Sequence, residues 1–172
     1  MPKETIQKKL LALYHLTSEQ LAEFLQGGPF DDYAVRVNEF EVFCAFWATA
    51  CYLHSPGDPD KDQVEHFNKS IIFSIVDRVS ALHPDELDEE QIDSLVQTIT
   101  NVFIERFSTY RECFQSDVKQ QEKGSYPLFP CLVDGFLVNI LDRPVPEQAH
   151  IRQLLDSFLE EMLDKSIVYF SS

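Results

Sequence analysis

Apolar residues recur along most of this chain at intervals of three and four, the spacing that places them on one face of an α-helix. No stretch alternates apolar and polar positions in the way that a half-buried β-strand does. The pattern therefore predicts an all-α protein of about six or seven helices. The predicted helices cover about 3–14, 17–26, 31–54, 60–82 and 88–118, a short segment within 128–141, and 147–168.

Boundary residues suggest how these helices are joined. The capping box that begins at Thr17 predicts a new helix there, so the first two helices are expected to form an N-terminal helical hairpin. Short connections that contain proline join the longer helices, and short connections make consecutive helices antiparallel neighbours. The predicted fold is an up-down antiparallel helical bundle that forms a single domain over residues 1–172, with neither an internal repeat nor a domain linker.

The longest apolar run, VFCAFWATACYL at residues 42–53, has 12 residues. A membrane-spanning helix needs about 20, so this run predicts a buried core helix. The N-terminal segment lacks the long apolar stretch of a signal peptide. We therefore expect a cytoplasmic protein with no membrane association. In a reducing cytosol its cysteines are expected to be free and mostly buried thiols. They are Cys44, Cys51, Cys113 and Cys131.

The net charge is −15, from 29 acidic and 14 basic side chains. A negative field of this size repels nucleic-acid phosphates and anionic lipids, so no nucleic-acid partner is predicted. Many of the acids stand at predicted helix N-termini, where the helix dipole favours them. These acids are Asp31, Asp32, Asp60, Asp62, Asp88, Glu89, Glu90 and Glu147. His15, His54 and His83 stand at predicted C-termini, so their positions indicate helix capping before catalysis.

Motifs for metals and cofactors fail on inspection. A calcium loop starting at Asp58 would need glycine and glutamate where Gln63 and Lys69 stand. Glu147 and His150 have the spacing found in di-iron bundles, but the chain has no second pair of that kind. Neither a phosphate-binding glycine loop nor a hydrolase or zinc-protease motif is present. The sequence thus predicts no metal and no cofactor, and it leaves open whether the protein is an enzyme.

Three arginines lie on the apolar faces of predicted helices: Arg36, Arg78 and Arg106. If the helices before and after Gly57 form a hairpin, Arg36 and Arg78 lie at the same height. Arg106 is then expected about 20 Å away, from the rise of 1.5 Å per residue. A buried guanidinium needs an acidic partner, and Glu39 is the predicted partner of Arg36 and Arg78.

Two interpretations of this cluster remain open. The first is a structural ion pair at the edge of the core, with Glu41 and Asp77 on outer faces. The second is a cleft in which Arg36, Glu39 and Arg78 bind an anionic ligand through bidentate hydrogen bonds. Structural ion pairs are more common than ligand sites, which favours the first interpretation.

The leading functional hypothesis is a non-enzymatic helical protein that acts through protein contacts, with a protein partner or as a homo-oligomer. Aromatic side chains with the potential to be exposed support it, namely Phe30, Tyr33, Phe129 and Phe170. The alternatives are a protein or enzyme that binds a small anion through Arg36 and Arg78, and an acidic inhibitor of a basic partner. An inhibitor of that kind needs one contiguous negative face, and the scatter of the acids over many helix starts argues against it.

Overall fold

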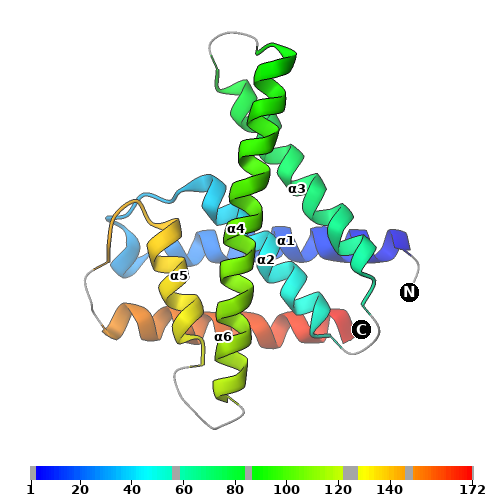
Figure 1. The fold of residues 1–172 in the computed structure, drawn as a ribbon. Coiled ribbons are helices and arrows are strands. Elements are labelled where there is room, and N and C mark those ends of the chain that lie inside the picture. The colour runs from blue at the N-terminus through cyan, green and yellow to red at the C-terminus, as the bar shows by residue number, and fades with distance from the viewer. Residues whose placement is uncertain (1–2, 56–58, 84–86, 122–127, 146–148, 172) are drawn as a thin grey trace.

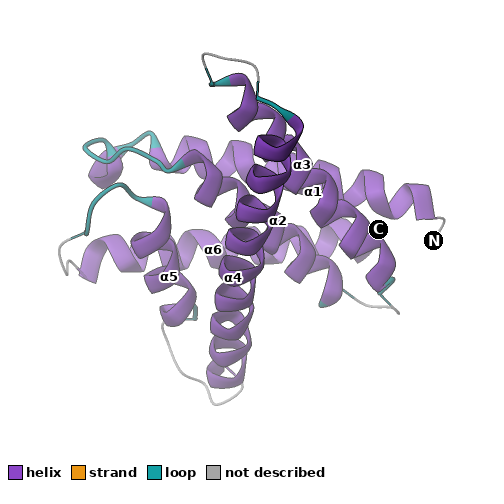
Figure 2. Ribbon diagram, turned by 45° about the horizontal axis from the view of Figure 1, so that its top comes forward, coloured by secondary structure: helices purple, strands orange, loops and turns teal. Residues whose placement is uncertain are grey.

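Six α-helices account for most of the described chain, so the all-α prediction is confirmed (Figure 1). The computed structural model describes residues 3–55, 59–83, 87–121, 128–145 and 149–171. The helices are α1 (Lys3–Leu25), α2 (Val37–Leu53), α3 (Lys61–Ala81), α4 (Glu89–Gln121), α5 (Pro130–Ile140) and α6 (Ala149–Ser171), with a short 3-10 helix η1 (Gly28–Phe30). Within these ranges, extended pairing is limited to one isolated bridge between Val35 and Leu141, and Figure 2 shows helices and loops without strands.

Helix α2 is the centre of the molecule. Twelve of its 17 residues are buried, and it contacts each of the other five helices. A helix that is apolar on every side must be covered on every side. The prediction of a buried core helix at residues 42–53 is confirmed. Among the described residues, no helix combines the length and the apolar character that crossing a membrane requires.

The up-down arrangement is not confirmed. Helices α1 and α6 run across α4 in both views, whereas an up-down bundle would align all the axes (Figures 1 and 2). Covering α2 on all sides explains this difference, because α1, α4 and α6 each contact it and cannot all do so as consecutive antiparallel neighbours.

The predicted N-terminal hairpin is wrong, because α1 is one continuous helix from Lys3 to Leu25. Its buried stripe includes Leu13 and Leu21, and Thr17 lies on the same stripe at 1% exposure. A face that keeps the 3–4 spacing through Thr17 is buried without interruption, so packing overrides the capping signal. His15 therefore stands in mid-helix and not at a C-terminus.

The segment before α2 is extended where a helix was predicted. Arg36 donates its backbone N–H to the Ile140 carbonyl at 2.8 Å, and Asp142 donates to the Ala34 carbonyl at 2.9 Å. This pairing with the end of α5 delays the start of α2 to Val37, so Asp31 and Asp32 are not helix N-terminal acids. Asp60 does cap α3, because its carboxylate accepts from the N–H groups of Asp62 and Gln63. Glu89 and Glu90 stand in the first turn of α4 as predicted, and Glu147 lies outside the described residues.

Two fully buried carboxylates hold the N-terminus of α5. Asp156 of α6 accepts from the N–H groups of Leu128 at 3.0 Å and Phe129 at 2.5 Å. Asp117 of α4 accepts from Cys131 at 3.1 Å and Leu132 at 3.0 Å. The first N–H groups of a helix have no partner within it, so these bonds satisfy donors that burial would otherwise leave unbonded.

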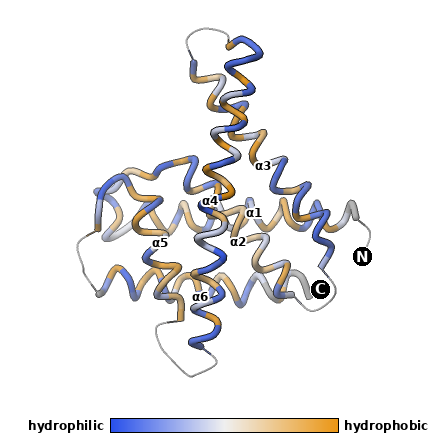
Figure 3. The backbone as a smooth tube through the Cα atoms, in the orientation of Figure 1, coloured by the Kyte–Doolittle hydropathy of each residue, from blue (hydrophilic) through white to orange (hydrophobic). Residues whose placement is uncertain are grey.

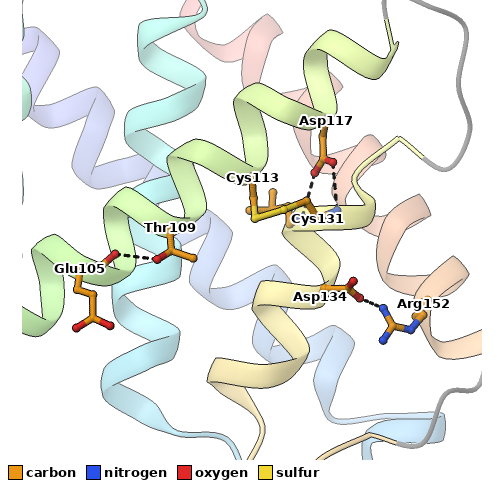
Figure 4. Close-up of a disulfide and its surroundings, with 8 residues drawn as sticks. Glu105, Thr109, Cys113, Asp117, Cys131, Asp134 and Arg152 are labelled. Atoms are coloured by element: carbon orange, nitrogen blue, oxygen red, sulfur yellow. Dashed lines mark hydrogen bonds and ion pairs between the residues drawn. A yellow bond between two sulfur atoms is a disulfide. The ribbon is translucent and has the colours of Figure 1, made fainter.

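Beside this anchor, Cys113 of α4 and Cys131 of α5 form a disulfide (Figure 4). The prediction of free thiols is wrong for this pair and correct for Cys44 and Cys51, which are free and buried. The two bonded cysteines are 18 residues apart and lie on different helices, so no short spacing motif marks them in the sequence.

The end of α3 and the start of α4 project from the body of the molecule (Figure 1). Figure 3 shows hydrophobic positions continuing into this projection. Several are well exposed, including Leu82 at 78% and Ile92 at 39%. The projecting hairpin thus carries apolar side chains that the rest of the described structure does not cover.

Candidate functional site: a groove beside two ion pairs

Arg78 of α3 binds the first turns of α2. One terminal nitrogen donates to Glu41 Oε2 at 2.5 Å and to Asn38 Oδ1 at 2.8 Å. Burial raises the pKa of Glu41, and the charge and hydrogen bond of Arg78 oppose that rise. The prediction that Glu41 lies on an outer face is wrong, because α3 packs over it.

Replacing Arg78 by methionine is expected to destabilise the protein by about 1 kcal/mol at pH 7, because Glu41 loses its cation. The folded-state pKa of Glu41 is raised, so its ionisation opposes folding as the pH rises through that pKa. The difference between the variant and the wild type should therefore shrink as the pH falls from 7 through the raised pKa, and it should be smallest below the ordinary value of 4.5. Urea unfolding at several pH values measures this, with Arg111→Met at an exposed site of α4 as the control. A difference independent of pH would contradict the assignment.

Arg106 of α4 binds the same region from the other side. Its Nε donates to both carboxylate oxygens of Glu39 at 3.1 Å, and Nη1 donates to Glu105 at 3.1 Å. Burial acts to lower the pKa of Arg106, and the bonds and charge of Glu39 outweigh it, so the pKa is raised. The predicted pairing of Glu39 with Arg36 and Arg78 is wrong.

The prediction that Arg106 lies about 20 Å from Arg36 and Arg78 is also wrong, because Arg106 bonds to Glu39 in the first turn of α2. That estimate assumed helices with parallel axes and common ends. Helix α4 instead starts in the projecting hairpin, beyond the N-terminus of α2, so Arg106, about five turns into α4, reaches Glu39.

Arg36 takes part in neither ion pair. It is the N-cap residue of α2, and its guanidinium donates to the backbone carbonyls of Asn139 at 3.4 Å and Asp142 at 3.3 Å. Glu39 thus lies in the first turn of α2 and bonds to Arg106, whereas Arg78 bonds to Asn38 and Glu41. Arg36 bonds to the end of α5. Their role in ligand binding stays a prediction.

A groove runs from these ion pairs along the projecting hairpin. Its inner part has a volume of about 260 Å³. It is lined by Asn38, Glu39, Val42, Ile75, Val79, Leu95, Thr98, Ile99 and Val102. The outer part, about 660 Å³, is lined by His83, Leu87, Asp88, Glu90, Gln91, Ser94, Leu95 and Thr98. Since both parts share Leu95 and Thr98, we treat them as one feature, the hairpin groove.

Most of the lining of the hairpin groove comes from a strongly acidic part of the chain. Residues 79–105 contain seven acidic residues and no lysine or arginine. Asp88, Glu90 and Glu105 are exposed in the structure. The cations that flank this segment in sequence, Arg78 and Arg106, are bonded to carboxylates. Asp88 and Glu90 line the outer part of the groove, so an apolar inner floor continues into a rim of negative charge at the outer end.

Sequence reasoning missed this groove because it assigned the apolar residues of α4 to the core. Leu95 and Ile99 are only half buried, and Val102 is 40% exposed. The absence of basic residues from 79–105 was the signal that could have indicated a surface with a defined charge. The aromatic residues that were predicted to be exposed do not form an alternative binding surface. Phe30 and Phe129 are buried, Tyr33 is half buried, and the Phe170 side chain lies outside the described residues.

Metal chemistry gains no support from side-chain clustering. Among the described residues, no group of three or more His, Cys, Asp or Glu side chains has an arrangement that suits a metal ion. Comparison of the chain with family models, with curated proteins and with solved structures finds no match. The geometry and charge of the hairpin groove are therefore the features that bear on function.

Proposed function

We propose that this protein is a binding module whose hairpin groove receives a basic amphipathic segment of a partner protein. One observation carries the proposal: an uncovered groove with an apolar inner part takes most of its lining from a 27-residue stretch, residues 79–105, that has seven acids and no lysine or arginine. Apolar side chains of the partner would pack against Leu95, Ile99 and Val102. Its lysines and arginines would face Asp88 and Glu90 at the rim, an arrangement typical of a helix bound in a groove.

Charge favours a different protein over a second copy of this chain. Two copies joined through this hairpin would bring the same acidic rims together, and like charges at an interface are costly. The proposed activity is binding without a catalytic step. An acidic inhibitor of a basic partner shares this chemistry, and the location in the cytoplasm stays a prediction.

A small anion bound through Arg36 and Arg78 remains the alternative hypothesis. Arg78 would have to exchange Glu41 for the ligand, and Arg36 would have to leave the backbone carbonyls of Asn139 and Asp142. A thermal-shift screen of small carboxylates and phosphates tests it, with Arg78→Ala as the control. Stabilisation by an anion that the variant loses would favour this alternative over the groove.

A designed helical peptide tests the proposal directly. It carries leucines at positions i, i+3, i+4 and i+7 with lysines on the remaining faces, and its matched control has glutamate in place of every lysine. We expect the lysine peptide to bind at least about 10-fold more tightly, because the rim attracts it, and to bind more weakly at high salt. Fluorescence anisotropy measures the affinity, and NMR shifts should concentrate at Leu95, Ile99 and Val102.

Two variants separate groove binding from general attraction to an acidic protein. Val102→Lys places a charge in the groove, whereas Ile104→Lys adds the same charge two residues along, on the opposite side of α4. Val102 is 40% exposed and Ile104 is 57% exposed, so both positions tolerate lysine. Val102→Lys should weaken binding about 10-fold or more, and Ile104→Lys only slightly. Equal effects of the two variants, or NMR shifts remote from the groove, would overturn the proposal.

A further inference from the structure

The disulfide between α4 and α5 is asymmetric in its exposure. Cys113 is buried at 9% exposure, whereas Cys131 is half buried. Cys131 is the second residue of α5, so it stands where the chain enters that helix, and its Cα lies 5.0 Å from that of Cys113 (Figure 4). Cys131 is thus the more exposed residue of the pair, and we expect an external thiol to reach it more easily.

Hydrogen bonds hold the start of α5 in addition to the disulfide. Asp117 and Asp156 already bind four backbone N–H groups of this segment from α4 and α6. Bonds of this kind to a carboxylate are roughly twice as strong as those between neutral groups. Breaking the sulfur–sulfur bond would leave these four contacts intact, so the bond can open while the helices stay packed.

We propose that Cys113–Cys131 is a thiol–disulfide exchange site, with Cys131 the sulfur that forms the mixed disulfide. The thiolate of an external dithiol attacks Cys131 Sγ, the disulfide breaks, and Cys113 leaves as a thiolate that takes a proton from solvent. The second thiol of the dithiol loses its proton and then displaces Cys131. The dithiol is oxidised to a disulfide, and the two cysteines gain two electrons and two protons.

The preference for attack at Cys131 comes from its greater exposure and not from electrostatic stabilisation of its thiolate. The dipole of α5 favours a thiolate at Cys131, but the charges of Asp117 and Asp156 oppose it at the same helix end. The two remaining cysteines are expected to react only slowly with thiol reagents. Cys44 and Cys51 are fully buried, and burial raises the pKa of Cys51 to about 12 and that of Cys44 well above its usual value.

Two single variants test which sulfur reacts. Cys113→Ala leaves the Cys131 thiol, and Cys131→Ala leaves the Cys113 thiol. The double variant measures the background from Cys44 and Cys51. With Ellman's reagent, an aromatic disulfide, we expect the Cys131 thiol of Cys113→Ala to react at least about 10-fold faster than the Cys113 thiol of Cys131→Ala. Equal rates, a faster Cys113, or no reaction of either thiol above the background would overturn the proposal.

The wild-type protein provides a test without mutation. Under native conditions dithiothreitol should reduce the disulfide, after which iodoacetamide labels Cys113 and Cys131, as mass spectrometry can detect. A thioredoxin-type CxxC protein tests whether a protein dithiol also reacts. The circular-dichroism signal of the helices should persist on reduction and the disulfide should re-form on oxidation. Reduction that requires denaturant, or labelling that accompanies loss of helix, would show a purely structural disulfide.

Discussion

Replacing Phe43 by alanine should lower the free energy of unfolding by about 4 kcal/mol, the range for truncating a fully buried phenylalanine. Phe43 is fully buried in α2. The centroid of its ring lies 4.9 Å from the ring centroid of Phe136 and 5.2 Å from that of Tyr110. The lost contacts join α2 to both α4 and α5, so neighbouring helices can fill the cavity only in part. Urea unfolding followed by circular dichroism measures the change.

Phe73→Ala provides the control for this experiment. Phe73 is 55% exposed on α3, so the same truncation there should change the stability by less than about 0.5 kcal/mol. A loss of less than about 1.5 kcal/mol for Phe43→Ala would show that the centre of the molecule is looser than the structure indicates.

Asp156→Ala should lower the free energy of unfolding by about 3 kcal/mol. The carboxylate is buried and accepts hydrogen bonds from Leu128 and Phe129, so its removal leaves two N–H groups without their partner at the start of α5. Each buried donor left unsatisfied costs about 1 to 3 kcal/mol. Chemical unfolding measures the loss, and amide hydrogen exchange should show faster exchange at Phe129.

Asp164→Ala on the same helix is the matched control, because Asp164 is exposed and its removal changes the net charge equally. We expect it to change the stability by less than about 0.5 kcal/mol. If both variants lost the same stability, the effect of Asp156 would come from overall charge and not from anchoring α5.

Local apolar pattern predicted the helices well, because burial of one face is a property that the sequence carries within a few turns. The run at 42–53 is the clearest case, since the residues that make it apolar on all sides also make it the central helix. The same reasoning explains Thr17. The capping residues there are a local signal worth about 1 kcal/mol, and the buried stripe that includes Leu13 and Leu21 exceeds it.

Contacts between helices were predicted less well, because they depend on axis directions that spacing does not define. Arg78 was correctly placed against the start of α2, but Glu39 bonds to Arg106, which was expected about 20 Å away. The pairing of Cys113 with Cys131 depends on how α4 meets α5, and no motif in either helix encodes it. The hairpin groove escaped notice because a half-exposed stripe and a core stripe have the same spacing.

The burial of α2 on every side has a consequence for synthesis of the protein. The helix that completes its cover, α6, leaves the ribosome after the other five helices. More than a hundred residues separate the end of α2 from the end of α6. At typical translation rates this interval lasts on the order of 10 s, during which the most apolar segment of the chain is incompletely covered. We therefore expect the nascent chain to be a client for chaperones that bind apolar segments, and the cover of α2 to be completed only after α6 has emerged.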